Sequence, residues 1–290
     1  SATEIWERII QNLISNSSHH FVNGSFSKRF YDFTTAYQLK STSQMSDFSQ
    51  EFSEFKVPNE AELISITQNE TSIGYSFNPE EIKNIRENNS EKLIALDLVS
   101  AVPSIPVDLS QIDTAYFSVQ KCFGLPAGMG VWIVGPKCFE VSKIKEYKNQ
   151  IVGSYHSLSV LKKNGDKNQT PETPNVLSLY LLKNVLKDMQ LKGIPSIQNE
   201  TKYKAALLYQ TFDQIMELNT IIPHPLNRSK TVCVSEVLGG NKGLIEYLKS
   251  KQLIIGSGYG SFKDQHIRIA NFPAHSKESI EMLVDEIGKY

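Results

Sequence analysis

The chain carries the segment TAYFSVQKCFGLPAGMG at residues 114–130. Its first six residues are largely apolar, aromatic or β-branched, which is typical of a buried strand. Lys121 follows this run, and three glycines come within the next nine residues. We therefore expect Lys121 to lie at the end of a strand, beside a glycine-rich turn.

A second apolar run, KLIAL at residues 92–96, ends in Asp97. Strands and helices alternate in this part of the chain, which favours parallel strands whose carboxyl ends share one edge of the sheet. Ligands bind at that edge in open α/β sheets. Pyridoxal phosphate chemistry needs an amine to form a Schiff base and an acid to keep the ring nitrogen protonated. Lys121 and Asp97 together indicate that cofactor.

Composition narrows the class of protein. The 290 residues are 40% hydrophobic, and 30 basic against 31 acidic residues leave a net charge of −1 without a basic block, so a nucleic-acid partner is not favoured. The three cysteines form no CxxC pair, which suits a reducing cytoplasm. No metal site is indicated, because the six histidines lack partners at ligand spacing. Neither a membrane span nor a secretory leader is visible, so we expect no membrane association.

The pattern predicts an α/β protein with a mostly parallel central sheet, helices on both faces and a smaller C-terminal α+β domain. We expect a large domain at residues 1–198 and a small domain at 199–290. Ser1 and Glu4 fit a capping box at the start of the first helix. The expected helices lie near residues 1–13, 27–39, 79–87, 176–189, 200–218, 242–251 and 277–287. The expected strands lie near residues 20–24, 61–66, 92–97, 113–119, 131–135, 231–236 and 266–270, with an acidic, Ser-rich stretch at 41–60 and a long loop at 153–174.

With these anchors the chain resembles the class V aminotransferases, which are fold-type I pyridoxal phosphate enzymes, and within them the phosphoserine aminotransferase group. The similarity runs along the whole chain and is strongest at residues 69–132. The glutamine before the lysine in Ser118-Val119-Gln120-Lys121 is characteristic of that group. Cysteine desulfurases, a neighbouring branch, usually have histidine there and need a cysteine on a mobile loop, for which Cys122 is poorly placed.

The resemblance assigns roles around the cofactor ring. Lys121 would hold the cofactor and then move a proton as the base, and Asp97 would pair with the ring nitrogen. Phe26 matches the aromatic residue that stacks on the ring, usually tryptophan in the phosphoserine group. Thr71 matches the threonine that hydrogen-bonds the 3′ oxygen. Taken alone, Phe26 could equally be a core residue, and Thr71 could simply form a turn.

The resemblance also assigns the cofactor phosphate and the substrate. The phosphate would lie at the start of the first helix, at Ala2 and Thr3, where free N–H groups favour an anion. Gln120 and Thr173 of a partner subunit would complete this site, which implies a homodimer with shared active sites. Arg268 matches the arginine that clamps the substrate carboxylate, although by itself it could belong to a structural ion pair.

Two departures from the group stand out. Phosphoserine enzymes have a His-Arg pair shortly before the clamping arginine, whereas this chain has GYGSFK at residues 258–263. Lys263 or an upstream residue would then have to bind the phosphate group of the substrate. Family members also have tens of residues before the phosphate site, so we expect that a first segment is absent from this sequence.

These observations favour a dimeric, cytoplasmic transaminase of amino-acid metabolism that acts on phosphoserine and 2-oxoglutarate, in serine biosynthesis. The first alternative is a class V enzyme acting on alanine, serine or glyoxylate, which the missing His-Arg pair supports. The second is a non-catalytic fold-type I module. The stretch Gly256–Gly260 superficially resembles a dinucleotide loop, but it lacks the long helix and acidic residue expected after it.

Overall fold

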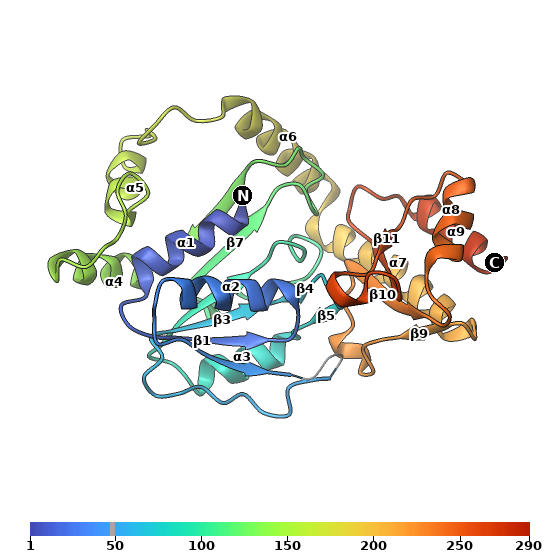
Figure 1. Cartoon of the computed structure of the whole chain (residues 1–290). Helices are drawn as coiled ribbons and strands as arrows, with labels where there is room; N and C mark the ends of the chain where they lie inside the picture. Colours follow the sequence, from blue (N-terminus) through green and yellow to red (C-terminus); the bar gives the residue numbers. More distant parts are fainter. Residues whose placement is uncertain (47–49) are drawn as a thin grey trace.

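The computed structural model describes residues 1–46 and 50–290, and its larger unit is built on a six-stranded sheet (Figure 1). Adjacent strands are parallel from β2 to β7, and β8 is antiparallel to β7. In sheet order the strands are β2 (Thr42–Met45), β1 (Ser18–Val22), β3 (Leu63–Thr67), β6 (Leu93–Asp97), β7 (Thr114–Ser118) and β8 (Gly130–Val134). The expected mostly parallel sheet is confirmed.

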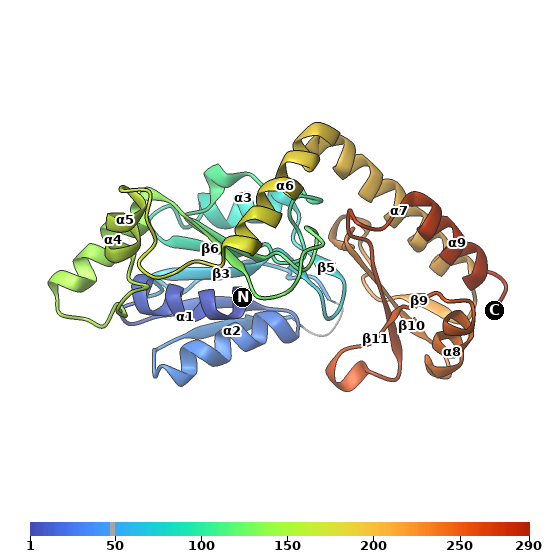
Figure 2. The same cartoon turned by 90° about the horizontal axis from the view of Figure 1, so that it is seen from above.

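Helices cover both faces of this sheet. Successive residues of a strand point to opposite faces, so neighbouring residues belong to different cores. Leu93 packs against α1, α2, α4 and α5, whereas its neighbour Ile94 belongs to the core that includes α3. Figure 2 shows α1 and α2 on one side of the sheet and α3 on the other. The helices of this unit are α1 (Ala2–Leu13), α2 (Ser25–Ala36), α3 (Pro79–Glu87), α4 (Pro136–Tyr147) and α5 (Leu158–Gly165).

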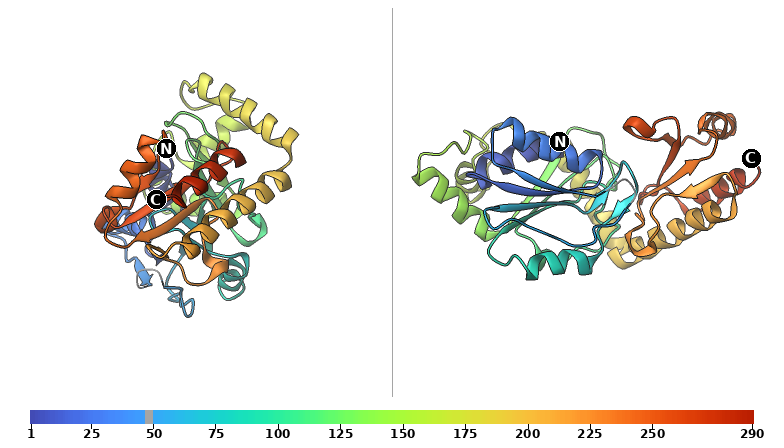
Figure 3. Two further views of the ribbon diagram at one scale, coloured as in Figure 1. Left: turned by 90° about the vertical axis from the view of Figure 1, so that its right-hand side faces the viewer. Right: turned by 60° about the horizontal axis from the view of Figure 1, so that its bottom comes forward.

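The smaller unit is a four-stranded antiparallel sheet with helices against it, and it lies beside the larger unit (Figures 2 and 3). The long helices α6 and α7 connect the two units and meet at Gly193, which has a φ of 84°. The domain boundary expected between residues 198 and 199 falls inside α7 and stays a prediction. The elements are α6 (Val176–Lys192), α7 (Ile194–Gln214), β9 (Leu218–Thr220), β10 (Val232–Val237), α8 (Lys242–Ser250), β11 (Gly256–Ser257), β12 (His266–Ala270) and α9 (Lys277–Ile287).

Buried polar contacts join the two units. The Asn227 amide donates to the Glu81 carboxylate and to the Tyr75 hydroxyl, each at 2.9 Å. The Thr231 hydroxyl, just before β10, donates to the carbonyl oxygen of Ser100, just after β6. These contacts place the strands of the smaller unit next to the carboxyl edge of the large sheet.

The remaining regular elements are short. They are a two-stranded ribbon of β4 (Asn69–Glu70) and β5 (Tyr75–Ser76), and 3₁₀ turns at Leu109–Gln111, Pro225–Asn227 and Gly260–Phe262. Within residues 1–46 and 50–290, no helix is both long enough and apolar enough to cross a lipid bilayer.

Several local predictions were wrong. The expected loop at 153–174 contains α5, which begins where the Ser157 hydroxyl accepts a hydrogen bond from the Val160 N–H and which buries Leu158. The polar strand β2 lies inside the stretch 41–60, of which residues 47–49 are outside the described residues. The Ser1 side chain makes no capping hydrogen bond, and Glu4 instead pairs with Arg8 at 2.7 Å.

Candidate active site

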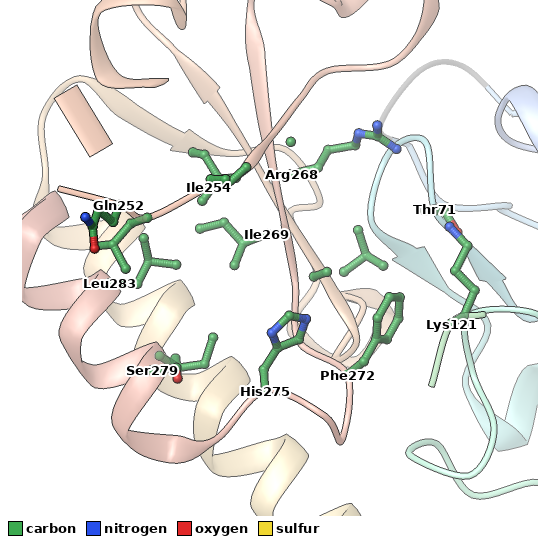
Figure 4. A pocket seen from close by; sticks show the side chains of 16 residues that line it. Thr71, Lys121, Gln252, Ile254, Arg268, Ile269, Phe272, His275, Ser279 and Leu283 are labelled. Carbon is green, nitrogen blue, oxygen red and sulfur yellow. The ribbon is translucent and has the colours of Figure 1, made fainter. Parts of the chain in front are cut away.

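Lys121 lies three residues beyond β7 and faces a cavity of about 370 Å³ at the carboxyl edge of the large sheet. Thr71 and Arg268 line the same cavity. Figure 4 shows Arg268 extending from the smaller unit toward the side on which Lys121 and Thr71 lie. Three of the residues expected from the sequence therefore meet in one place, although they come from three distant parts of the chain.

The Lys121 amine is in an environment that disfavours its charge. Burial lowers the pKa of Lys121, and the positive charge of Arg268 lowers it further. An amine with a lowered pKa is more often neutral near pH 7, and only the neutral amine can act as a nucleophile or accept a proton. Lys121 is therefore suited to both roles expected of it.

Asp97 ends β6 and is only 5% exposed. Burial raises the pKa of Asp97 to about 7, an effect that the Val99 N–H, donating at 2.8 Å, partly opposes and the charge of Glu70 adds to. Among the described residues, no lysine or arginine nitrogen lies within 4 Å of this carboxylate. A cation brought to this site by a ligand would stabilise the ionised carboxylate.

Two aromatic side chains hold Asp97 in place. Asp97 and Tyr116 are direct neighbours across β6 and β7, and the Tyr116 hydroxyl donates to the Asp97 carboxylate. Trp6 of α1 donates from Nε1 to the Tyr116 hydroxyl at 2.8 Å. Sequence reasoning used Trp6 only as a core residue of the first helix and did not assign Tyr116. The polar atoms of the two aromatic residues were the available signal, because a buried Trp N–H or Tyr O–H normally has a partner.

The start of α1 is fixed next to the strand that precedes Lys121. The Ala2 N–H donates to the Ser118 hydroxyl at 2.8 Å, and Gly130 allows the backbone of Ser1 to approach closely. Thr3 follows in the first turn of the helix. The amide oxygen of Gln120 is buried and has no hydrogen-bond partner among the described residues, so the side-chain amide is available to a ligand.

Glu70 organises the start of α2 and was missed by sequence reasoning. Its carboxylate accepts hydrogen bonds from the backbone N–H of Phe26 at 3.1 Å and of Ser27 at 2.9 Å, and from the Ser72 hydroxyl at 2.6 Å. A carboxylate at a helix N-terminus is favoured by the free N–H groups and the helix dipole. Gly24 permits this approach, because a Cβ there would collide with the Glu70 side chain. Glu70 thus fixes the backbone of Phe26. The sequence did offer a signal for Glu70, because this residue directly precedes Thr71 in the part of the chain where the resemblance is strongest.

Thr71 belongs to a small hydroxyl network. Its hydroxyl donates to Ser100 Oγ at 2.8 Å, and the Asn69 amide donates to the same oxygen at 2.8 Å. Ser100 Oγ in turn donates to the Asn69 carbonyl oxygen at 3.0 Å. The Thr71 side chain is therefore held in one orientation at the cavity wall.

Arg268, on β12, has no acidic partner among the described residues. Its Nε donates to the Ser257 carbonyl oxygen at 2.8 Å, and its guanidinium lies over the ring of Tyr259. No carboxylate of the described residues is within 4 Å of it. Burial lowers the pKa of Arg268, yet a guanidinium stays protonated in proteins. This arrangement leaves the terminal nitrogens available to an external carboxylate and disfavours the structural ion pair considered from the sequence.

Thr173 lies apart from these residues. It is exposed on the segment between α5 and α6, and its neighbours Glu172 and Pro174 line a second cavity of about 510 Å³. Ser1 and Glu4 of the same chain line that cavity as well. His156, also at this cavity, lies 3.7 Å from both Glu4 and Glu172. The segment thus lies beside the start of α1, and the expected contribution of Thr173 to a partner subunit stays a prediction.

Known proteins resemble this chain along its whole length. The chain is 27% identical to the phosphoserine aminotransferase of Rhodococcus opacus (strain B4) over 297 residues, covering 98% of this chain and 76% of that protein. It is 40% identical to the crystal structure of a phosphoserine aminotransferase SerC from Cytophaga hutchinsonii, with a TM-score of 0.97 over 100% of this chain and 81% of that one. A Thermus thermophilus aspartate aminotransferase of subgroup IV, 19% identical, shares the fold with a TM-score of 0.85 over 100% of this chain and 82% of that one.

A match to a protein family over most of the chain shows which family this protein belongs to. Residues 35–275 fit the family described as aminotransferase class-V. That range contains Asp97, Lys121 and Arg268, and the resemblance inferred from them is confirmed. The protein belongs to the class V aminotransferase family.

Proposed function

We propose that this protein is a pyridoxal phosphate-dependent transaminase that moves an amino group between phosphoserine and 2-oxoglutarate. The observation that carries the proposal is that Lys121, Thr71 and Arg268 line one cavity. Asp97, at the end of the strand beside β7, is a buried carboxylate with no lysine or arginine nitrogen within 4 Å among the described residues. The names of the relatives support phosphoserine as the amino acid.

The residues present fit this cofactor. Its ring nitrogen carries a positive charge when protonated, which is what the environment of Asp97 lacks. Its phosphate is an anion, and the start of α1 offers a helix N-terminus that the Ser1 side chain does not cap. Gln120, directly before Lys121, would donate to the phosphate from its amide nitrogen, since only the N–H of an amide binds an anion. Phe26 would cover one face of the ring, and Thr71 would contact its 3′ oxygen. Thr3 and Ala2 would bind the phosphate.

The chain's own residues would then direct the reaction. When bound, pyridoxal phosphate supplies an aldehyde and an electron-withdrawing ring. Lys121 would provide its Nζ for attachment and, once displaced by the substrate amine, would carry a proton on Nζ to and from the substrate α-carbon. Asp97 would keep the ring nitrogen protonated. Arg268 would orient the substrate by binding its α-carboxylate at two nitrogens.

A second candidate is a class V transaminase that acts on alanine, serine or glyoxylate. It is favoured by the segment at residues 258–263, which has no His-Arg pair and contributes Tyr259 next to Arg268. A non-catalytic module is disfavoured, because a structural fold would gain nothing from burying Asp97 with no cation beside it among the described residues.

We also propose a homodimer. No residue of α6 is buried, although the helix carries several large apolar side chains, and Val176, Leu177 and Tyr180 are each more than 60% exposed. A monomer rarely exposes so large an apolar surface. The proposed cellular location is the cytoplasm, which the three free, buried cysteines support.

Asp97→Asn tests whether the ligand must supply a cation. Without cofactor, folding shifts the pKa of Asp97 from 3.8 to about 7. Below pH 4 the group is protonated in both states, and between pH 4 and 7 only the unfolded state loses the proton, so stability falls as pH rises. Asparagine cannot ionise, so the stability of the variant does not fall with pH for this reason. We expect its free energy of unfolding to rise relative to wild type by up to roughly 4 kcal/mol across this range, measured by urea denaturation.

The same comparison with pyridoxal phosphate present gives the control. The cofactor should stabilise the wild-type protein more than Asp97→Asn, because only the carboxylate pairs with the ring nitrogen. A difference in unfolding free energy that stays constant from pH 4 to pH 8 would contradict the role given to Asp97.

Lys121→Ala tests the catalytic assignment. We expect it to abolish transamination of phosphoserine with 2-oxoglutarate, measured by product formation, while the circular dichroism spectrum stays unchanged. Lys202→Ala, at an exposed position on α7, is the matched control and should retain full activity. Wild-type kcat/KM should be higher for phosphoserine than for alanine by at least about a hundredfold, because a charged substrate group is distinguished strongly. A higher value for alanine would establish the second candidate, and turnover by Lys121→Ala would remove the mechanism.

Leu177→Glu combined with Tyr180→Glu tests the homodimer. Sedimentation equilibrium of the wild-type protein should give twice the chain mass of 32.7 kDa, and the double variant should shift toward the monomer and lose activity, because two charges would be buried in the interface. Met216→Glu replaces another exposed apolar side chain, 86% exposed, and should remain dimeric. A fully active wild-type monomer would contradict shared active sites.

A further inference from the structure

Tyr259 lies between the two units, in contact with both. Its ring centroid is 5.2 Å from that of Phe26, with 42° between the ring planes. On the other side, Cζ of Arg268 lies 5.3 Å from the Tyr259 ring centroid. Both separations are within the range of favourable aromatic and cation–π contacts. Phe26, Tyr259 and Arg268 therefore form a continuous series of contacts from the larger unit to the smaller one, which we call the tilted Tyr259 stack.

Each end of this stack is anchored separately. Phe26 is held by its backbone N–H, which donates to Glu70 at 3.1 Å. Arg268 is held by Nε, which donates to the Ser257 carbonyl oxygen at 2.8 Å. No other hydrogen bond from the described residues restrains the guanidinium, so the end of the side chain can still rotate. The Tyr259 ring is the contact that restricts this rotation while leaving the terminal nitrogens uncovered.

Two glycines set the position of Tyr259. At Gly258 an added Cβ would collide with the Phe262 carbonyl oxygen, and Gly260 has a φ of 57°, which favours glycine. The turn between β11 and β12 is thereby made tight on both sides of the tyrosine. The Gly-Tyr-Gly stretch thus serves to place one aromatic ring.

We propose that Tyr259 is a positioning residue whose ring, packed at a tilt against Phe26, holds the Arg268 guanidinium in the orientation that binds the carboxylate shared by amino-acid and 2-oxo-acid substrates. The inference rests on the proposed function for the identity of the substrates. The ring performs this task, since Phe26 and the Arg268 guanidinium both contact Tyr259 at its aromatic ring and not at its hydroxyl.

The test compares Tyr259→Phe, which keeps the ring, with Tyr259→Leu, which removes it. Succinate, which cannot react, reports carboxylate binding by calorimetry in the full chain with pyridoxal phosphate added. We expect Tyr259→Phe to bind succinate within about twofold of wild type and Tyr259→Leu to bind about tenfold more weakly. KM for phosphoserine and for 2-oxoglutarate should rise by a similar factor in Tyr259→Leu, with kcat changed less than about threefold.

Three further variants complete the experiment. Arg268→Lys should lose succinate binding, which shows that the probe reports the arginine. Tyr247→Leu removes another tyrosine that has a cation over its ring, with Lys251 Nζ at 5.5 Å, and should leave succinate binding unchanged. Phe26→Leu should also weaken binding, and its effect should add less than fully to that of Tyr259→Leu, because both changes break one stack.

The outcomes separate this inference from the proposed function. Wild-type succinate affinity in Tyr259→Leu, or equal losses in the Leu and Phe variants, would overturn the positioning role of the ring. Unchanged succinate affinity in Arg268→Lys would overturn it as well. If the wild-type protein does not turn over phosphoserine but the succinate series behaves as expected, the proposed substrate is wrong and the role of Tyr259 stands.

Discussion

A buried carboxylate without a cationic neighbour among the described residues is the constraint on which this cleft depends. Asp97 is held at the carboxyl edge of the sheet by the Val99 N–H and by Tyr116, yet burial still raises its pKa to about 7. Such a group is costly for the protein alone, since a charge removed from water needs a partner. A ligand that brings a positive charge would offset the free energy needed to bury the ionised Asp97. We therefore expect ligand binding to stabilise the folded protein.

The surrounding elements are arranged about this edge. The parallel strands β6 and β7 place Asp97 and Lys121 there, and the hydrogen bond from Ala2 to Ser118 brings the start of α1 to the same place. In the proposed complex, Asp97 would pair with a positively charged ring, the start of α1 with an anionic group and Lys121 with an aldehyde. Because β12 carries Arg268 from the other unit, the position of one unit relative to the other sets the distance between Lys121 and Arg268 across the cavity.

Charge is distributed unevenly in this cleft. Glu70 is fully buried, and its carboxylate is satisfied by the start of α2 and by serine side chains. Lys121 and Arg268 face the cavity, and their mutual repulsion contributes to the lowered pKa of the lysine. The Arg268 guanidinium, which stays protonated, therefore makes this part of the cavity wall cationic, while the Glu70 carboxylate is buried away from it. This arrangement suits a substrate that enters with a carboxylate.

The sequence was sufficient for features that depend on local pattern. Lys121 and Asp97 could be predicted because each directly follows a strand-like run, and the sheet itself because strands and helices alternate. Glu70, the Trp6 to Tyr116 contact and the tilted Tyr259 stack could not, because each joins segments that are distant in sequence and depends on how they pack. The capping box expected at Ser1 is absent for a similar reason, because it also depends on a side-chain contact. The carboxylate of Glu4, which the capping box requires, pairs with Arg8 instead.

The central claim is that the cleft is an assembled transamination site, and the visible absorption spectrum tests it most directly. Pyridoxal phosphate added to the protein should give the yellow band of a lysine-bound cofactor. Phosphoserine added next should convert that band to the pyridoxamine spectrum, because an amino group has been transferred, and alanine should do so far more slowly. A protein that is colourless once unbound pyridoxal phosphate has been removed, or a band that no amino acid changes, would contradict the account.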